Sequence, residues 1–205
     1  MRFYNTKILP RLIHWVCSQK DFSRQREKIV PLASGRVLEV GMGSGLNLPF
    51  YDASNIDRVW GLEPDEALLE LAGERAGKAA FDVSFIHRSG EEIPLENRSM
   101  DTVLVTYTLC TIPDVGKALG EMRRVLKPGG RLLFCEHGRA PDGKVAAWQD
   151  RITPAWKKVS GGCRLNRPIP ALIREGGFKI DRLKEGYNGP IRITGFTYRG
   201  VAVCD

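Results

Sequence analysis

Short apolar runs separated by amphipathic segments make up most of the chain from residue 36 onward. The apolar runs predict buried strands at residues 36–40, 58–62, 83–87, 100–106 and 131–135. The segments between them predict helices at residues 64–76 and 115–126, with room for one short helix between the first two strands. Strands that alternate with helices in this way build a parallel sheet covered on both faces. The pattern therefore predicts an α/β protein.

The last part of the chain predicts a closing unit for this sheet. We expect a helix over 169–175 that stops at the following glycine pair, and then a pair of strands over 178–187 and 196–204. Pro128 and Gly129 predict a type II turn before the fifth strand, because Pro presets the turn and Gly supplies a positive φ. The expected architecture is a Rossmann-like, doubly wound seven-stranded sheet, mostly parallel with an antiparallel C-terminal strand.

An amphipathic segment precedes the sheet, from Phe3 to Val30. Ile8, Leu12, Trp15 and Val16 recur there at helical spacing, with basic residues such as Lys7 and Arg11 between them. We predict a helical cap that packs over the mouth of the site. A helix that lies on a membrane surface is the alternative interpretation.

Composition agrees with a single folded domain of 205 residues, with 42% hydrophobic and 27% charged residues. No run of about 20 apolar residues or signal peptide is seen, so we expect a cytoplasmic protein. The five cysteines are scattered and form no CxxC pair. This spacing argues against a disulfide framework and a structural zinc site, so we expect no metal, with Cys110 and Cys163 as packing residues.

The net charge of +7 would attract nucleic acid, anionic lipid or an acidic substrate. Basic residues are spread along the chain and do not interleave with aromatic residues, as they do in single-strand nucleic-acid binders. We therefore expect no nucleic acid partner, and peripheral contact with an anionic membrane stays open. The residues carry no signal of an oligomeric state.

A glycine-rich loop, Glu39-Val40-Gly41-Met42-Gly43-Ser44-Gly45, follows the first strand. Doubly wound sheets bind nucleotides at this position, and glycines let the backbone approach the ligand closely. The third glycine of the dinucleotide fingerprint would be residue 46, which is Leu46, so a pyrophosphate ligand is less favoured. Glu63, at the end of the second strand, is suited to accept hydrogen bonds from both ribose hydroxyls.

Four segments in order now resemble a known family: EVGMGSG, GLEP, SGEEIPLENRSMDTVLVTYTLC and RRVLKPGGRLLF. They resemble the class I S-adenosylmethionine-dependent methyltransferases with a type-11 methyltransferase domain, over about residues 35–137. The resemblance implies a cofactor site for S-adenosylmethionine, with S-adenosylhomocysteine as product. The residues that it implies are Glu39, Gly41, Gly43, Gly45, Asn47, Glu63, Pro64, Ser89, Gly90, Glu91 and Thr106. Ser89 stands where the family usually has a carboxylate.

A narrower resemblance extends toward residue 167. TLCTIPD, Glu136-His137 and WQDRITPAWKKVSGGCRLNR are similar to stretches of the microsomal alkyl-thiol methyltransferases and their bacterial relatives. This implies a small-molecule acceptor, with a thiol favoured. The microsomal enzymes have a hydrophobic membrane anchor, where this chain has the basic amphipathic segment.

The alternatives are methylation of a quinone precursor or phospholipid amine at a membrane surface, a basic nucleic-acid binder of the same fold, and a nicotinamide oxidoreductase. The single domain would divide into a cap (1–34), a cofactor-binding core (35–137), an acceptor-side insertion (138–168) and the closing unit (169–205).

The reaction common to these methyltransferases is in-line displacement at a sulfonium methyl group, in which positioning supplies much of the acceleration. His137, at the end of the fifth strand, is the candidate general base for a thiol acceptor. Tyr107 is expected to border the acceptor pocket and is the second candidate catalytic residue. Arg164, Asn166 and Arg167 are candidates to cover that pocket.

Overall fold

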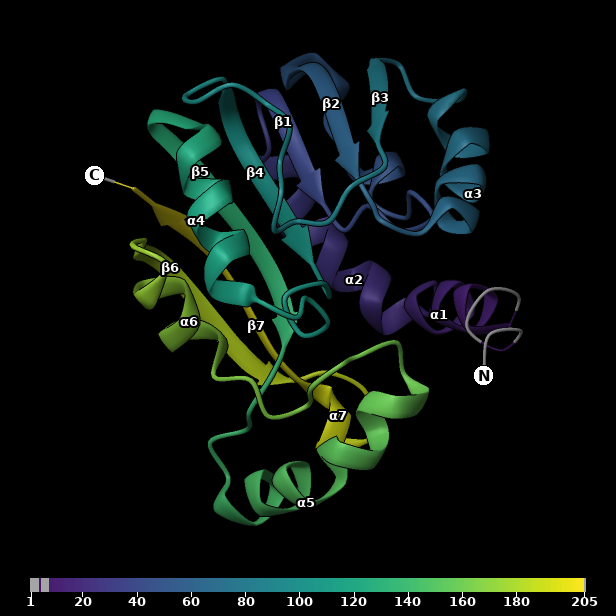
Figure 1. The fold of residues 1–205 in the computed structure, drawn as a ribbon, viewed down its shortest axis with the longest axis vertical. Helices are drawn as coiled ribbons and strands as arrows, with labels where there is room; N and C mark the ends of the chain where they lie inside the picture. The colour runs from purple at the N-terminus through teal and green to yellow at the C-terminus, as the bar shows by residue number, and fades with distance from the viewer. Residues whose placement is uncertain (1–3, 5–7, 205) are drawn as a thin grey trace.

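The computed structural model describes Tyr4 and residues 8–204, so Phe3 and Lys7 of the amphipathic segment lie outside the described residues. Its centre is a seven-stranded sheet in the order β3-β2-β1-β4-β5-β7-β6 (Figure 1). The strands are β1 (Gly35–Val40), β2 (Ile56–Leu62), β3 (Asp82–Ile86), β4 (Met100–Thr106), β5 (Leu126–His137), β6 (Lys179–Tyr187) and β7 (Phe196–Val203). The first five strands run parallel, and β7 is antiparallel to both β5 and β6. The Rossmann-like, mostly parallel sheet is therefore confirmed.

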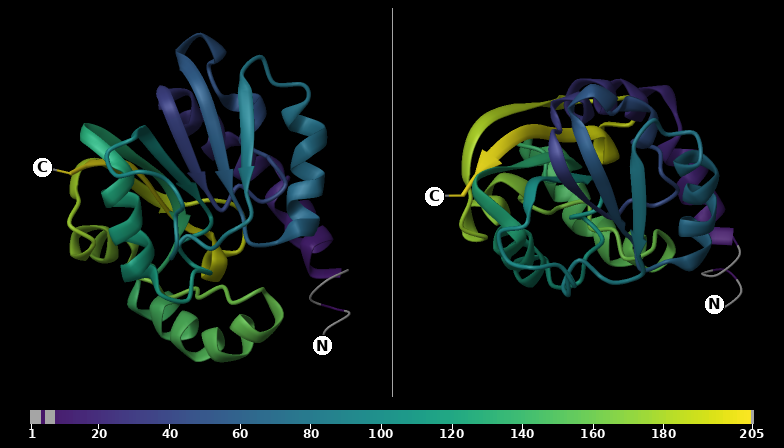
Figure 2. Two further views of the ribbon diagram at one scale, coloured as in Figure 1. Left: turned by 45° about the horizontal axis from the view of Figure 1, so that its top comes forward. Right: turned by 90° about the horizontal axis from the view of Figure 1, so that it is seen from above.

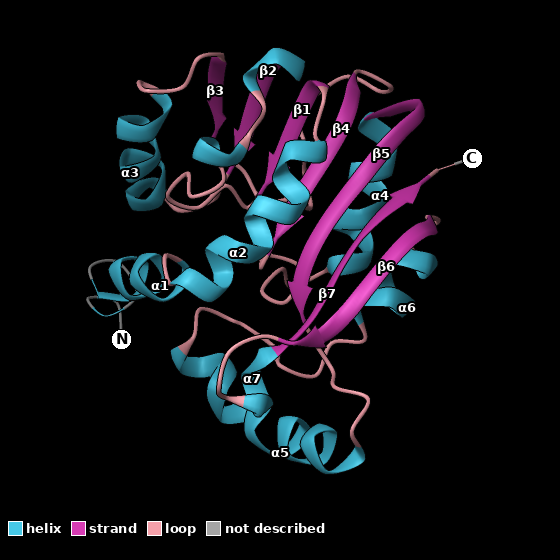
Figure 3. Cartoon of the chain, turned by 180° about the vertical axis from the view of Figure 1, so that it is seen from behind, coloured by secondary structure: helices cyan, strands magenta, loops and turns pink. Residues whose placement is uncertain are grey.

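Helices cover both faces of the sheet and one of its ends, as Figures 2 and 3 show from other directions. The α-helices are α1 (Leu9–Cys17), α2 (Lys20–Ile29), α3 (Glu66–Ala76), α4 (Val115–Val125), α5 (Gly143–Val159), α6 (Ile169–Glu175) and α7 (Arg192–Gly195). In Figure 1, α4 and α6 lie in front of the sheet, and Figure 3 shows α2 on the opposite face. The helices α1, α5 and α7 gather beyond the carboxyl ends of β1 to β5, where a parallel sheet binds ligands.

Two apolar cores follow from the alternation of side chains along the strands. Leu38, Val103 and Phe134 face one side of the sheet and pack against α4 and α6. Val37 and Leu104 face the other side, where they join apolar residues of α2 and α3. Because β1 and β4 are buried on both faces, their sequences are almost continuously apolar.

Three expectations about local structure were wrong or incomplete. Between β1 and β2 the chain forms two 3₁₀ turns, Leu48–Phe50 and Ala53–Asn55, in place of the expected short helix. The glycine loop occupies the first part of the segment between β1 and β2. A helix does not start there, because Gly43 and Gly45 adopt a positive φ. The amphipathic segment forms two helices, and residue 19 between them is extended. The insertion contains α5, a 17-residue helix that the sequence analysis did not predict.

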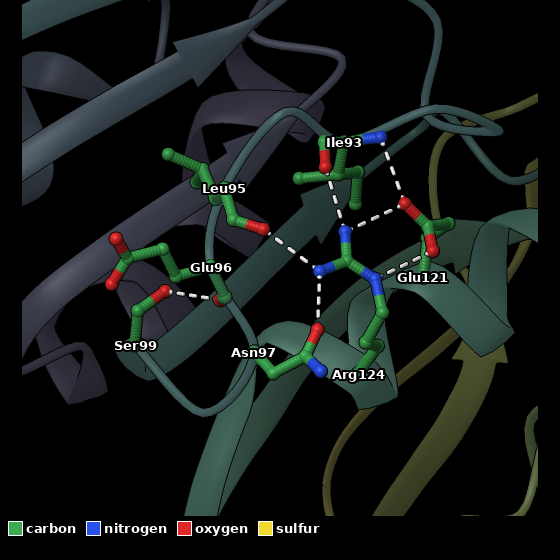
Figure 4. Close-up of polar contacts among 7 residues, drawn as sticks. All are labelled: Ile93, Leu95, Glu96, Asn97, Ser99, Glu121 and Arg124. Carbon is green, nitrogen blue, oxygen red and sulfur yellow. Dashed lines mark hydrogen bonds and ion pairs between the residues drawn. The ribbon is translucent and has the colours of Figure 1, made fainter.

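Arg124 at the end of α4 holds the loop between β3 and β4 against that helix (Figure 4). Its guanidinium donates to the carbonyls of Ile93 (2.7 Å) and Leu95 (2.8 Å) and to Asn97 Oδ1 (2.7 Å). Glu121, one turn earlier, pairs with the same guanidinium at 2.7 Å and accepts from the Ile93 amide at 3.0 Å. One side chain therefore satisfies several polar groups of a loop that has no regular structure of its own.

Within the described residues, no helix is both long enough and apolar enough to cross a membrane. Gly129 has a φ of +76°, as the predicted turn requires, and β5 continues through this irregularity.

Candidate active site

A cavity of about 480 Å³ opens at the carboxyl ends of β1, β2 and β4. The glycine loop, Glu63, α1, residues 106–113 and residues 161–164 all contribute to its wall. Its size lies within the range of small-molecule sites, and its place at the ends of the first parallel strands is where such sheets bind ligands. The cavity is therefore the candidate active site.

The glycine loop turns sharply beneath the cavity. Gly41 has a φ of +70°, and a Cβ there would lie 2.2 Å from side-chain atoms of Thr108. Gly43 also has a positive φ, and its amide donates to Glu63 Oε2 at 2.9 Å. Gly45 packs toward Leu48 and does not line the cavity. Of the three glycines, Gly41 thus forms the wall itself, and Gly43 anchors the loop to the end of β2.

Glu63 lines the cavity with 7% of its surface exposed. Its Oε1 accepts from the amide of Asp65 at 3.1 Å, so backbone groups hold both carboxylate oxygens in place. Burial raises the pKa of Glu63. Each carboxylate oxygen keeps a second lone pair, so the group can accept hydrogen bonds from two hydroxyls of a ligand.

Asn47 connects the cavity to a buried carboxylate behind it. Its Nδ2 donates to Glu39 Oε1 (2.9 Å) and Thr106 Oγ1 (3.0 Å). Tyr51 donates to the other oxygen of Glu39 at 2.7 Å, yet burial still raises the pKa of Glu39 to about 7. Asn47 Oδ1 is buried and has no partner among the described residues. A buried acceptor of this kind is usually satisfied by an ordered water or by a ligand donor.

Pro64, Ser89 and Gly90 line the same side of the cavity as Glu63. Gly90 lies close to Val40, where a Cβ would come within 3.0 Å of that side chain. Glu91 does not line the cavity, because its carboxylate accepts from the Asp114 amide at 2.6 Å and from Ser89 Oγ at 2.6 Å. Its side chain thus joins this loop to the start of α4.

Tyr107 lines the cavity at the end of β4 with a φ of +54°, which is rare for a residue other than glycine. Its hydroxyl lies 3.6 Å from Cys135 Sγ, and burial raises its pKa well above the usual value. Its ring packs edge-on against Phe22, and the Arg26 guanidinium lies 5.7 Å from the ring centroid. The strained backbone therefore brings the ring to the cavity wall and the hydroxyl to the core.

His137, the candidate base, is not among the residues that line the cavity. It is half-buried at the end of β5, and its Nε2 lies 3.3 Å from Cys163 Sγ. Hydrogen bonds from Cys110, His137 and Trp156 hold the pKa of the Cys163 thiol well below its usual value. Burial opposes the protonation of His137, but its hydrogen bond to Cys163 raises the pKa of the imidazole.

The N-terminal helices add cavity residues that sequence reasoning missed. Leu9, His14 and Cys17 of α1 and Arg26 of α2 line the cavity, and His14 Nδ1 lies 2.7 Å from Ser44 Oγ. The amphipathic segment therefore contributes side chains to the cavity wall. Its functional side chains could not be identified in advance, because the helical spacing marks the apolar face without showing which residues meet the glycine loop.

Of the three polar residues expected over the acceptor pocket, Arg164 lines the cavity. Asn166 donates to Asp150 Oδ1 at 2.8 Å instead. Arg167 is buried and donates to the carbonyls of Leu109 and Ile112, so it holds the loop that forms the wall.

Comparison with known proteins supports the resemblance seen in the sequence. Residues 38–134 match the model of a family described as "Methyltransferase domain". Thiol S-methyltransferase TMT1B of Homo sapiens is 39% identical over 66% of this chain and 57% of its own length. Thiol S-methyltransferase TMT1A of Homo sapiens is 32% identical over 80% of this chain and 68% of its own length. The chain thus spans about three fifths to two thirds of the length of these relatives.

A solved structure from Thermotoga maritima, described as a SAM-dependent methyltransferase and possible histamine N-methyltransferase, superposes with a TM-score of 0.66. It covers 97% of both chains at 22% identity, which shows a shared fold.

Proposed function

Because the chain belongs to the methyltransferase family, we propose that it is an S-adenosylmethionine-dependent methyltransferase that acts on a small-molecule acceptor, with a thiol as the favoured class. The observation that carries the proposal is the cavity itself. In the proposal, the part of the wall around Glu63 and Asn47 holds the cofactor and is its cofactor end, and the part around Tyr107, Lys157 and Arg164 faces the acceptor and is its acceptor end.

The residues at the first end fit S-adenosylmethionine. Glu63 can accept from the two ribose hydroxyls, and the unpaired Asn47 Oδ1 can accept from the ammonium of the methionine part. Gly41 contributes its backbone to the cavity wall, and Pro64 and Gly90 border the place for adenine. When bound, the cofactor supplies an electrophilic methyl group on a sulfonium.

The acceptor end is lined by Leu9, Ile13, Tyr107 and three cationic side chains. These cations are Arg26, Lys157 and Arg164, and Arg26 is 4% exposed. Positive charge favours the thiolate form of an acceptor thiol over its neutral form, and the thiolate is the nucleophile. The apolar side chains favour an alkyl or aryl substituent and exclude water from the reacting sulfur.

His137 as a general base remains a prediction, since its Nε2 faces Cys163 in this structure. Tyr107 is proposed to shape the acceptor pocket through its ring, because its hydroxyl is directed to Cys135.

We also propose that α1 contacts anionic membranes peripherally. Leu12, Trp15 and Val16 expose 42%, 62% and 38% of their surfaces on this helix, next to the exposed Arg11. An exposed apolar face with basic neighbours, at the mouth of an apolar cavity, suits an acceptor that partitions into lipid. A quinone precursor or a phospholipid amine is therefore the alternative acceptor class.

The test is methyl transfer from isotopically labelled S-adenosylmethionine to three acceptors offered separately. These are an alkyl thiol, a demethylated quinol and phosphatidylethanolamine vesicles. We expect labelled thioether from the thiol and loss of most activity in Glu63→Ala. Transfer to the quinol or the lipid but not to the thiol would select the alternative, and binding of nicotinamide dinucleotide in place of the cofactor would reject the proposal.

A further inference from the structure

Cys110, His137 and Cys163 form a cluster behind the acceptor end of the cavity. Their potential ligand atoms, two sulfurs and one ring nitrogen, all lie within 4.8 Å of one another. They come from three segments: the loop after β4, the end of β5 and the loop after α5. The loop after β4 and the loop after α5 also contribute residues to the wall of the cavity.

The spacing of the cluster suits a tetrahedral zinc ion. Zinc binds thiolate sulfur at about 2.3 Å and imidazole nitrogen at about 2.0 Å, so its ligands lie roughly 3.5–3.8 Å apart. The distance between His137 Nε2 and Cys163 Sγ is 3.3 Å, so small side-chain movements would admit the ion. Two thiolates neutralise the charge of the ion, which lowers the free-energy cost of burying it.

The surrounding structure holds the ligands in place without an ion. The Arg164 amide donates to the carbonyl of Cys110 at 2.9 Å and joins the segments that carry the two cysteines. Trp156 Nε1 lies 3.3 Å from Cys163 Sγ, where it can stabilise a thiolate ligand. Hydrogen-bonded support of this kind orients ligands in metal sites.

The cluster supplies three ligands, and the described residues place no fourth histidine, cysteine or carboxylate with them. A zinc site with three protein ligands keeps one position for an exogenous ligand, as catalytic zinc sites do. Thr111 and Gly162, the neighbours of Cys110 and Cys163, line the acceptor end of the cavity.

We propose that Cys110, His137 and Cys163 bind a zinc ion whose fourth coordination position takes the sulfur of the thiol acceptor. The identity of the fourth ligand rests on the proposed function, whereas the metal site does not. The acceptor thiol releases its proton to water as its sulfur binds zinc. The sulfur electron pair then forms the new carbon–sulfur bond, and the bond from the methyl carbon to the sulfonium breaks to leave a thioether and S-adenosylhomocysteine.

The scattered cysteines predicted a protein without a metal, and the proposed zinc site contradicts that prediction. Those cysteines share no CxxC pair, and only folding brings two of them to the same histidine. In the proposal, His137 is a metal ligand and not a free base.

The first test measures metal in the full-length protein, loaded with Zn²⁺ under a thiol-free reductant and then desalted. We expect about one zinc per chain, lost in Cys163→Ser and in His137→Ala. Cys204→Ser, outside the cluster, is the matched control and should retain zinc. Thermal unfolding with and without a chelator should show stabilisation by zinc in wild type and in Cys204→Ser, but not in Cys163→Ser.

Folding of the variants is checked independently by circular dichroism. Absence of stoichiometric zinc from the wild type, or equal zinc in the folded Cys163→Ser and the control, overturns the metal site.

The second test replaces zinc by Co²⁺ and adds 2-mercaptoethanol without S-adenosylmethionine. The wild type should show thiolate-to-cobalt absorption that changes when the thiol is added. A spectrum that the thiol leaves unchanged overturns the role of the acceptor as fourth ligand. Methylation of thiols by metal-free protein at the full rate overturns the inference and leaves the proposed function intact. Bound zinc without any thiol methylation supports the site and rejects the thiol acceptor.

Discussion

At the residue scale, the Glu63 carboxylate has two roles, because it accepts from the Gly43 amide of the glycine loop and also lines the cavity. The substitution Glu63→Gln keeps its size and removes its charge. Loss of charged hydrogen bonds to two ribose hydroxyls typically costs about 1.5–3 kcal/mol, so we expect S-adenosylmethionine to bind about 10- to 100-fold more weakly. Isothermal titration measures this. Glu66→Gln, at the exposed start of α3, is the control and should bind as wild type does.

The buried carboxylate of Glu39 predicts a dependence of cofactor binding on pH. Its pKa of about 7 in the ligand-free protein means that it is mostly neutral below pH 7. A cationic ligand at Asn47 favours the ionised form of Glu39. Binding at pH 6 therefore includes the free-energy cost of ionising Glu39, whereas at pH 8 Glu39 is already mostly ionised. The affinity of wild type relative to Glu39→Gln should therefore rise about tenfold from pH 6 to pH 8.

Isothermal titration at several pH values checks the ratio. If the affinity of wild type relative to Glu39→Gln stays constant or falls as the pH rises, Glu39 does not become ionised when the ligand binds.

At the scale of elements, Arg124 makes most of the side-chain hydrogen bonds that join α4 to the loop before β4 (Figure 4). Arg124→Ala leaves the carbonyls of Ile93 and Leu95 without their donor. We expect the free energy of unfolding to fall by about 2 kcal/mol, the usual cost of breaking such a network. Urea denaturation measures it, with Arg123→Ala on the exposed side of the same turn as control. Equal losses in both variants would contradict the role of the network.

The insertion is the element whose structure was least visible in the sequence. Pro154 lies inside α5, and a proline normally argues against a helix interior. The helix persists because Asp142 caps its start and Gln149 donates from within it to the carbonyls of Gly138 and Ile193. Tertiary hydrogen bonds thus outweigh the low helix propensity of proline, which in the sequence alone argues against a helix at this position.

At the scale of the whole molecule, a net charge of +7 combines with the exposed apolar face of α1. We expect the protein to sediment with phosphatidylserine vesicles at low salt, and less at high salt because salt screens the attraction. Trp15→Ser should weaken this binding, whereas Trp148→Ser, which removes an exposed tryptophan from α5, should not. No sedimentation at low salt would reject peripheral membrane contact.

The sequence by itself determined the sheet and the position of the glycine loop and Glu63 at its edge. Strand periodicity, the glycine loop and Glu63 are local features, since neighbours in the chain decide where a strand ends and which residue follows it. The strand β4 accordingly has the predicted bounds, Met100–Thr106.

Only the tertiary structure decided the acceptor end. It turned the Tyr107 hydroxyl to Cys135, drew Arg26 into the cavity and joined His137 to two cysteines distant in the chain. These contacts join residues that lie tens of positions apart in sequence, so their pairing follows from packing and leaves no periodic signal in the chain.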